Sequence, residues 1–240
     1  MALFAVQIMK DLVSDQFYLQ ESSAGNTKEY FEYVLARISE QLPQAGQFSA
    51  IDVGCAAGDF IRRAKEVLRP TGSRRVVWHG ADLSEEMISA ARIGNEEGSF
   101  YRFDFTKDRL PESYDVITLF GTLEYSADAG VLRGLIQSLR PGGVLHVITP
   151  LNPDPVDVVV KSTSPDRTWE KSYYLHSVET VQTVCRDVAA RVNVSEWVCS
   201  LDLPRREDPL RSWTVKVDGK RVAINGCSVL KYMFHVEVFA

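Results

Sequence analysis

The chain has 240 residues, of which 45% are hydrophobic and 25% are charged, and its formal net charge is −5. This is the composition of an ordinary globular protein, and the acidic balance argues against nucleic acid as the main partner, because nucleic-acid-binding proteins usually carry a basic stripe. The four cysteines are scattered without a CxxC pair, which predicts neither a bound metal nor a disulfide framework. No apolar run approaches the ~20 residues of a membrane span, and the first residues lack a basic start, so we expect a cytoplasmic protein.

The length favours one domain over residues 1–240. A first helix is predicted where Asn26 and Glu29 have the spacing of a capping box and apolar residues then recur at helical intervals. Pro43 and Gly46 end this helix. We therefore treat residues 1–46 as an N-terminal helical arm whose apolar face packs against the rest of the domain.

A strand over Ser49–Val53 is followed by a turn of small residues and then by an amphipathic helix over Phe60–Leu68. Such units hold nucleotides, because small residues let a ligand approach the free N–H groups at the helix start. The small residues fall at positions 54, 56 and 58, which does not match the dinucleotide fingerprint, since Asp59 replaces its third glycine. A carboxylate in the turn repels a pyrophosphate but not a ligand with a positive centre. The alternative is an ordinary strand-to-helix connection.

Two further predicted strands end in carboxylates. A strand over Arg75–Ala81 leads to Asp82, which can accept hydrogen bonds from both hydroxyls of a ribose. A strand over Ser99–Phe105 contains Asp104, which can accept from the exocyclic amine of a purine, and Phe105, which offers its backbone N–H or its ring. Each aspartate also has a plainer interpretation as a turn or surface residue.

Two more strands continue the pattern. Tyr114–Phe120 is almost entirely apolar, and a helix over Val131–Leu139 separates it from a strand over Val144–Thr149. This regular alternation predicts a parallel sheet with helices on both faces, and ligands bind such sheets at the carboxyl ends of the strands. The residues that the sequence places at these ends are Asp52, Asp82, Asp104 and Phe120.

Five segments, taken together, resemble the class I S-adenosylmethionine-dependent methyltransferases. They span roughly residues 48–150, so that residues 47–150 form a predicted cofactor-binding core and residues 151–240 an acceptor-side region. One departure is Ala56, which stands where the family's usual turn has a second glycine; we expect a tighter contact there, not a lost site. The matching segments are Asp52–Gly58, Gly80–Met87, Asp104-Phe105, Asp115–Ile117 and Leu139–Gly143.

The resemblance implies an α/β, Rossmann-like sheet of seven strands in the order 3-2-1-4-5-7-6, with the last strand antiparallel and helices on both faces. Val194–Leu201 fits strand six, and Val229–Phe239 fits strand seven. Between them, Asp218-Gly219 joins two short apolar runs at 213–217 and 220–224, the strongest hairpin signal in the chain. We interpret it as an inserted β-hairpin that covers the substrate, pairs with another subunit or extends the sheet.

The resemblance also implies S-adenosylmethionine as the cofactor. The turn from Gly54 to Gly58 approaches its amino acid half, Asp82 holds the ribose, Leu83 borders the adenine and Phe120 faces the methionine part. Asp104 and Phe105, at the end of the third strand, then contact the exocyclic amine of the adenine. The predicted cofactor-binding residues are Asp52, Gly54, Cys55, Ala56, Gly58, Asp82, Leu83, Met87, Asp104, Phe105 and Phe120.

Methyl transfer from a sulfonium is a one-step displacement that depends on aligned substrates and excluded water. A hydroxyl acceptor must also lose its proton, which calls for a base. The candidates are Glu124 and Tyr125 after the fourth strand and His176 on the acceptor side, and of these we favour Tyr125 or His176. Residues 202–209 and the hairpin are similar to those of bacterial methyltransferases of sugar or glycan biosynthesis. We therefore expect O-methylation of a small molecule or sugar by a monomer or homodimer.

Two other functions stay open. One is an NAD(P)-dependent oxidoreductase on the same kind of sheet, against which the glycine spacing and Asp59 argue. The other is a non-catalytic S-adenosylmethionine-binding partner subunit. An intact turn is equally compatible with that role, because the acceptor site is not visible in the sequence.

Overall fold

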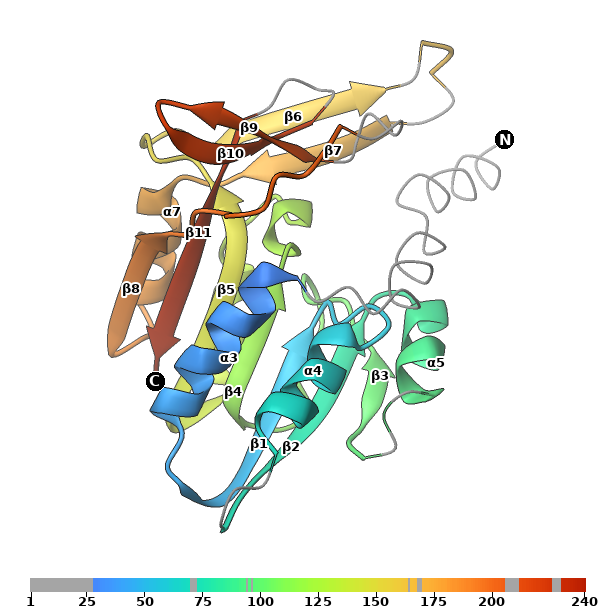
Figure 1. The fold of residues 1–240 in the computed structure, drawn as a ribbon, viewed down its shortest axis with the longest axis vertical. Helices are drawn as coiled ribbons and strands as arrows, with labels where there is room; N and C mark the ends of the chain where they lie inside the picture. Colours follow the sequence, from blue (N-terminus) through green and yellow to red (C-terminus); the bar gives the residue numbers. More distant parts are fainter. Residues whose placement is uncertain are drawn as a thin grey trace.

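The computed structural model describes residues 28–69, 73–93, 95, 97–163, 165–167, 170–205, 212–225 and 230–240. Within these ranges the chain forms one mixed sheet, a separate two-stranded sheet and helices on both faces of the larger sheet (Figure 1). None of the described helices is long and apolar enough to cross a membrane.

The order of the main strands is β3-β2-β1-β4-β5-β11, and β8 pairs with the outer side of β11. β1 to β5 are parallel to one another, whereas β11 runs antiparallel to both β5 and β8. With β8 as strand six and β11 as strand seven, the predicted order 3-2-1-4-5-7-6 is confirmed. The strands are β1 (Ala45–Val53), β2 (Ser73–Asp82), β3 (Phe100–Arg102), β4 (Tyr114–Phe120), β5 (Leu139–Leu151), β8 (Arg191–Glu196) and β11 (Leu230–Phe239).

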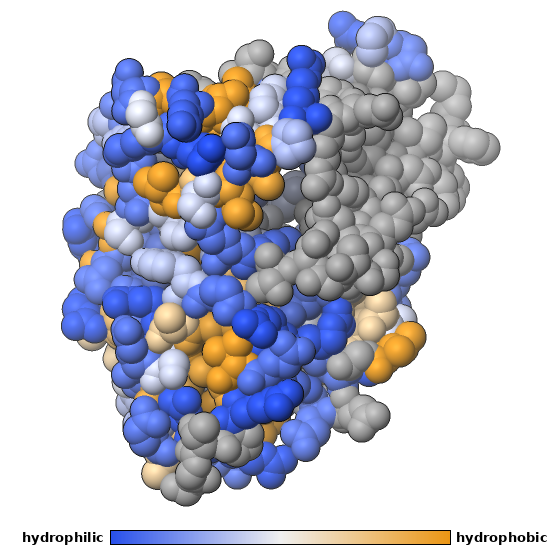
Figure 2. All heavy atoms as spheres, viewed as in Figure 1, coloured by the Kyte–Doolittle hydropathy of each residue, from blue (hydrophilic) through white to orange (hydrophobic). Residues whose placement is uncertain are grey.

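Two buried clusters cover the two faces of this sheet. Alternate residues of a strand point to opposite faces, so Ala50 of β1 belongs to one cluster and Ile51 to the other. The helices α3 (Glu29–Gln41), α4 (Asp59–Val67) and α5 (Glu85–Ile93) contribute to one cluster. The helices α6 (Val131–Gln137) and α7 (Val178–Arg186) contribute to the other. On the side that carries α3 and α4, hydrophilic residues cover most of the surface and hydrophobic residues appear in separate patches (Figure 2).

The predicted hairpin is present as β9 (Trp213–Val217) and β10 (Lys220–Ile224). Asp218 and Gly219 at its tip both have positive φ, +49° and +81°, as a two-residue hairpin turn requires. β10 pairs with the start of β11 through Ala223 and Lys231, so the hairpin extends the main sheet. Of the three predicted roles, extension of the sheet is therefore the one that the strand pairing supports.

A second hairpin, β6 (Val158–Thr163) and β7 (Glu170–Leu175), was not predicted. Its connection is six residues long and lacks an Asn-Gly or Asp-Gly pair, so it carries no short-range hairpin signal. The hairpin lies beyond the carboxyl end of β5, above the main sheet in Figure 1. It thus brings residues of the acceptor-side region toward the end of the sheet where ligands bind.

Several predicted boundaries differ from those of the structure. Strand six was expected over Val194–Leu201, whereas β8 covers Arg191–Glu196, and β5 begins at Leu139 instead of Val144. β3 ends at Arg102 instead of Phe105, because the next backbone N–H, from Phe103, bonds to the Asp82 carbonyl and Asp104 then starts a turn. The first helix begins at Glu29, with Lys28 as an N-cap that makes no side-chain cap bond. Glu29 accepts a hydrogen bond from the Ser200 N–H at 2.9 Å instead of closing a capping box. Asn26 lies outside the described residues.

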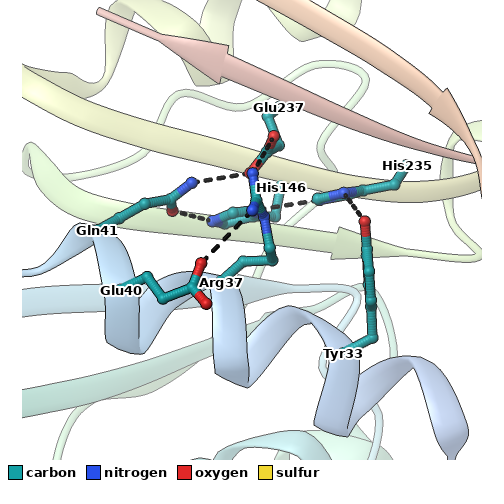
Figure 3. A network of polar contacts seen from close by, with 7 residues as sticks. All are labelled: Tyr33, Arg37, Glu40, Gln41, His146, His235 and Glu237. Atoms are coloured by element: carbon teal, nitrogen blue, oxygen red, sulfur yellow. Dashed lines mark hydrogen bonds and ion pairs between the residues drawn. The ribbon is translucent and has the colours of Figure 1, made fainter.

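A buried polar network joins α3 to β5 and β11 (Figure 3). His146 on β5 contacts Gln41 Oε1 through its Nε2 at 2.9 Å and His235 Nε2 through its Nδ1 at 3.0 Å. His235 Nδ1 lies 3.3 Å from the Tyr33 hydroxyl. Gln41 Oε1 is an acceptor only, so His146 Nε2 carries a proton and His146 Nδ1 accepts from His235. The Tyr33 hydroxyl must then donate to His235 Nδ1, so that the donor and the acceptor of each of these three hydrogen bonds are assigned.

Arg37 balances the charge of Glu237 in this network. The Arg37 guanidinium donates to both oxygens of Glu237, at 3.2 and 3.1 Å, and the Gln41 amide donates to Glu237 at 2.8 Å. The ligand atoms of His146, His235 and Glu237 lie within 4.8 Å of one another, close enough to hold a metal ion. Arg37 already supplies the positive charge there, however, and each imidazole nitrogen has a partner. The arrangement is that of a clamp between a helix and two strands.

The clamp predicts lower stability in acid. Burial lowers the pKa of both His146 and His235 below 6.5, so below about pH 6.5 the unfolded chain binds more protons than the folded one and the free energy of unfolding falls. In His235→Gln, which retains one donor and one acceptor, the fall from pH 7 to pH 5 should be smaller by about 1–2 kcal/mol in urea titrations. Tyr33→Phe retains both imidazoles and should keep the wild-type fall. Equal falls in His235→Gln and wild type would contradict the assignment.

Candidate functional site

The carboxyl ends of β1, β2 and β4 meet where the first turn of the sheet begins. Val53, the last residue of β1, pairs with Ala81 on one side and Leu119 on the other, and β2 and β4 each continue for one more residue, so the three strands end almost level with one another. Gly54 and Cys55 both donate backbone hydrogen bonds to the Ala81 carbonyl, at 2.7 and 3.0 Å. The turn of residues 54–58 is therefore folded back across the end of β2.

The turn needs its small residues for local reasons. Gly54, Ala56 and Gly58 have φ values of +75°, +46° and +79°. A Cβ at position 54 would lie 2.3 Å from Oγ1 of Thr122, so no larger residue fits there without displacing that side chain. Ala56 adopts the left-handed region although it carries a Cβ, at a cost of about 1–2 kcal/mol. This is the position where the sequence departs from the usual glycine of the turn.

The Asp82 side chain holds the turn of residues 54–58 in place through hydrogen bonds. Its Oδ2 accepts from the Ala56 N–H and its Oδ1 from the Ser84 N–H, both at 2.9 Å. One carboxylate therefore links the turn after β1 to the turn after β2. Ser84 in turn accepts from the Met87 N–H at 3.3 Å, at the start of α5. A carboxylate oxygen accepts up to two hydrogen bonds, so these contacts are compatible with the predicted ribose contact.

Asp52 is a buried acid beneath the turn. Its side chain is 3% exposed and accepts a hydrogen bond from the Thr118 hydroxyl at 2.6 Å. The pKa of Asp52 is raised to about 7, mainly by burial and to a smaller extent by the charges of Asp82 and Asp59, whereas the Thr118 hydrogen bond and the charge of Lys28 lower it. A cationic ligand group at this place would favour the ionised carboxylate. The site is thus electrostatically suited to a positive centre.

The other predicted cofactor residues differ in exposure. Leu83 is 57% exposed at the end of β2, whereas Met87 and Cys55 are buried. The Cys55 sulfur packs beneath the turn, where burial raises its thiol pKa. Phe120 packs against other aromatic rings, with ring centroids 4.8 Å from Phe60 and 5.4 Å from Tyr30.

The carboxylate of Asp104 closes its own turn. Its Oδ1 accepts from both the N–H and the hydroxyl of Thr106, at 3.0 and 2.5 Å, and Lys107 lies 2.9 Å from Oδ2. Phe105 is partly buried against the core. Asp104 lies two residues beyond Arg102, which pairs with Asp82, so the two aspartates follow neighbouring strand ends. Asp104 therefore lies close to the end of β2, where Asp82 is found, but its carboxylate also has a local structural role in its own turn.

The three base candidates lie beyond β4 and β5. Glu124, in the short 3-10 helix η1 (Leu123–Tyr125), is buried and accepts from the Thr149 hydroxyl at 3.2 Å. Burial raises its pKa, and the charges of Lys231 and Lys171 oppose the shift. Tyr125 is 43% exposed.

His176 is buried, and its Nε2 lies 3.0 Å from the Ser126 carbonyl oxygen. Because a carbonyl oxygen only accepts, this contact places a proton on Nε2. His176 is thus held between the η1 region and the end of β7.

Residues that the sequence did not single out surround Glu124. Tyr173 of β7 has a buried hydroxyl without a hydrogen-bond partner among the described residues. Lys231 Nζ lies 4.5 Å from the centroid of the Tyr173 ring, and Lys171 Nζ lies 5.0 Å from that of Tyr125. The only signal for the strand that carries Lys171 and Tyr173 was its short run of strand-favouring residues, without a turn signal to pair it.

Comparison with known proteins adds to this geometry. A family model described as "Methyltransferase domain" matches residues 51–145, which include the turn, Asp82 and Glu124. The matched segment, which is similar to methyltransferase domains, runs from the end of β1 to the middle of β5, the same part of the chain in which the sequence motifs lie.

The fold agrees with solved methyltransferase structures. A putative S-adenosylmethionine-dependent methyltransferase from Listeria monocytogenes has a TM-score of 0.58 at 17% identity, covering 88% of this chain and 99% of that one. An S-adenosylmethionine-dependent methyltransferase from Mesorhizobium loti has a TM-score of 0.56 at 20% identity, covering 85% and 96%. At sequence identities this low, the similarity shows that these proteins share the fold of this chain, and it shows nothing further about function.

Curated relatives include the trans-aconitate 2-methyltransferases of Acidovorax sp. (strain JS42) and Acidovorax ebreus (strain TPSY). Each is 28% identical over 171 residues, which cover 67% of this chain. The aligned part spans 63% of the length of these relatives.

The buried charge of Asp52 gives a stability prediction. Because the folded-state pKa of about 7 exceeds the ordinary value of 3.8, ionisation destabilises the fold increasingly from pH 4 to pH 7. Asp52→Asn, which still accepts from Thr118, should therefore be more stable than the wild type by about 2–4 kcal/mol at pH 8 and by little at pH 4.5, in urea titrations without ligand. Asp128→Asn changes an exposed carboxylate and should show no such gain. A variant that gained nothing at pH 8 would refute the buried charge.

Proposed function

We propose that this protein transfers a methyl group from S-adenosylmethionine to an oxygen atom of a small molecule. The observation that carries the proposal is the buried Asp52 carboxylate beneath a turn of left-handed residues, at the end of a methyltransferase sheet. S-adenosylmethionine supplies a methyl group on a cationic sulfur together with a cationic amino group. The negative charge of Asp52 complements such a cation, whereas a pyrophosphate would be repelled.

The roles proposed on the cofactor side are those that the family resemblance implies, and the positions of the residues are compatible with them. The backbone of Gly54 to Gly58 approaches the amino acid half, Asp52 balances its positive charge, and Asp82 accepts from the ribose hydroxyls. Leu83, exposed at the end of β2, offers an apolar surface to the adenine. Asp104 and Phe105 follow the neighbouring strand on the adenine side.

The roles on the acceptor side rest on Glu124. Its carboxyl group is held by Thr149 and has a raised pKa, which suits a general base near neutral pH. In the reaction the acceptor oxygen bonds to the methyl carbon while the carbon–sulfur bond breaks and its electron pair stays on sulfur, which gives S-adenosylhomocysteine. The hydroxyl proton passes to Glu124. Tyr125 and His176 then border the acceptor, with His176 fixed by Ser126.

The acceptor class is the finer part of the proposal. The named activity of the curated relatives points to a small carboxylic acid. A sugar or glycan acceptor remains a prediction of the sequence similarity alone. Both are small oxygen-containing molecules, which agrees with a site formed by the short segments η1 and β7.

The two other functions make different predictions. A non-catalytic subunit would bind S-adenosylmethionine but release no S-adenosylhomocysteine with any acceptor until a partner protein is added. An oxidoreductase would bind NAD(P) in place of S-adenosylmethionine. The match of residues 51–145 to a methyltransferase domain model argues against the oxidoreductase, and calorimetry with both cofactors decides it.

Asp82→Ala should weaken S-adenosylmethionine binding by about 1–3 kcal/mol, because the ribose contacts and the tie to Ala56 are lost together. Isothermal titration calorimetry measures the change. Asp115→Ala is the matched control, since Asp115 also accepts a backbone N–H, from Ser49 at 2.7 Å, but at the opposite end of the parallel strands. Equal affinities of Asp82→Ala and wild type would show that the ribose lies elsewhere.

Glu124→Gln should lower kcat by about 10²–10⁴-fold with an unchanged cofactor affinity, because the amide retains the Thr149 contact but takes no proton. Release of S-adenosylhomocysteine with a panel of small hydroxyl compounds gives the rates. In the wild type kcat should rise with pH as Glu124 ionises, and in the variant this rise should disappear. A variant with the wild-type pH profile would exclude Glu124 as the base.

A further inference from the structure

Four side chains from three separate elements gather around Glu124. Tyr125 comes from η1, Lys171 and Tyr173 come from β7, and Lys231 comes from the start of β11. The charges of both lysines act on Glu124, and the Glu124 charge acts on Tyr173. These interactions place the four side chains around one carboxyl group beyond the ends of β4 and β5.

The two ammonium groups are held by aromatic rings. Lys231 Nζ lies over the Tyr173 ring at 4.5 Å and Lys171 Nζ over the Tyr125 ring at 5.0 Å. A cation over a ring face is attracted by the ring's quadrupole, which orients it without neutralising its charge. The cluster thus brings two ammonium groups close to one carboxyl group that has a raised pKa.

Tyr173 supplies an independent observation. Its hydroxyl is buried and has no hydrogen-bond partner among the described residues, although buried hydroxyl groups in proteins nearly always have one. A neighbouring carboxylate, Glu124, is close enough to raise the tyrosine pKa further after burial has raised it. Within the described part of the chain, this donor therefore has no acceptor.

We infer that the acceptor is a small hydroxy acid, whose anionic group is bound by Lys171 and Lys231 and accepts a hydrogen bond from the Tyr173 hydroxyl. The inference rests on the proposed function, because the hydroxyl group of the same molecule is the one that faces Glu124. A carboxylate and a phosphate share the required chemistry. The methyl group goes to the hydroxyl oxygen, its proton goes to Glu124, and the anionic group is unchanged by the reaction.

The experiment uses the full chain saturated with S-adenosylhomocysteine and titrated by calorimetry with malate, citrate and glycerol 3-phosphate. Dimethyl malate serves as a neutral analogue. We expect at least one of the acids to bind and dimethyl malate to bind at least 10-fold more weakly than malate or not at all. Binding of malate or citrate alone identifies a carboxylate, and binding of glycerol 3-phosphate alone identifies a phosphate.

Three variants test the residues. Lys171→Met and Lys231→Met should each weaken acid binding at least 10-fold, whereas Lys161→Met, at an exposed lysine of β6 paired with Glu170, should not. Tyr173→Phe should weaken acid binding about 3–10-fold while its melting temperature without ligand is unchanged or higher, because no protein hydrogen bond is removed. A tyrosine with only a structural role would leave the acid affinity unchanged.

The outcomes separate this inference from the proposed function. If the wild type does not bind S-adenosylhomocysteine, the proposed function fails and the inference fails with it. If S-adenosylhomocysteine binds but none of the acids does, or if the acids bind Lys171→Met and Lys231→Met as tightly as wild type, the inference alone is overturned. Calorimetric S-adenosylhomocysteine affinity checks that each variant is folded.

Discussion

The two hydrogen bonds accepted by Asp82 determine the shape of the cofactor end of this molecule. One holds Ala56 in the middle of the first turn and the other holds Ser84 in the second, so two segments 28 residues apart in sequence are joined by a single carboxylate. The bond to Ala56 also helps to keep a residue with a Cβ in a left-handed conformation. Because the buried Asp52 lies beneath the same turn, the position of the predicted cation site depends on this tie.

The sheet was predictable because its pattern is local. Most parallel strands are apolar runs followed by a turn and an amphipathic helix. The Asp218-Gly219 pair is a hairpin-turn signal, and it predicted the one hairpin that was expected. The turn of residues 54–58 and the carboxylate at 82 could be identified for the same reason, since both follow directly from a strand end. What the sequence did not reveal is that Asp82 is bonded to Ala56, a contact between two such ends.

The acceptor side was less predictable, because its residues are brought together only by the fold. Glu124, Thr149, Tyr173 and Lys231 come from four elements, and β7 is placed there by a hairpin with no recognisable turn. Asp104 has a local contact that the strand-end pattern did not predict: the nearby Thr106 offers it two donors within its own turn. Local competition of this kind is typical of aspartate.

The clamp beneath α3 has a consequence at the far end of that helix. Gln41 and Arg37 fix the last turns to Glu237 and His146, while the first turn places Tyr30 within 5.4 Å of Phe120 and 6.0 Å of Trp197, measured between ring centroids. A helix is stiff along its axis, so anchoring one end also fixes the rotation and height of the other. The positions of the aromatic rings of Tyr30, Phe120 and Trp197 near the end of β4 therefore depend on polar contacts at the opposite end of α3.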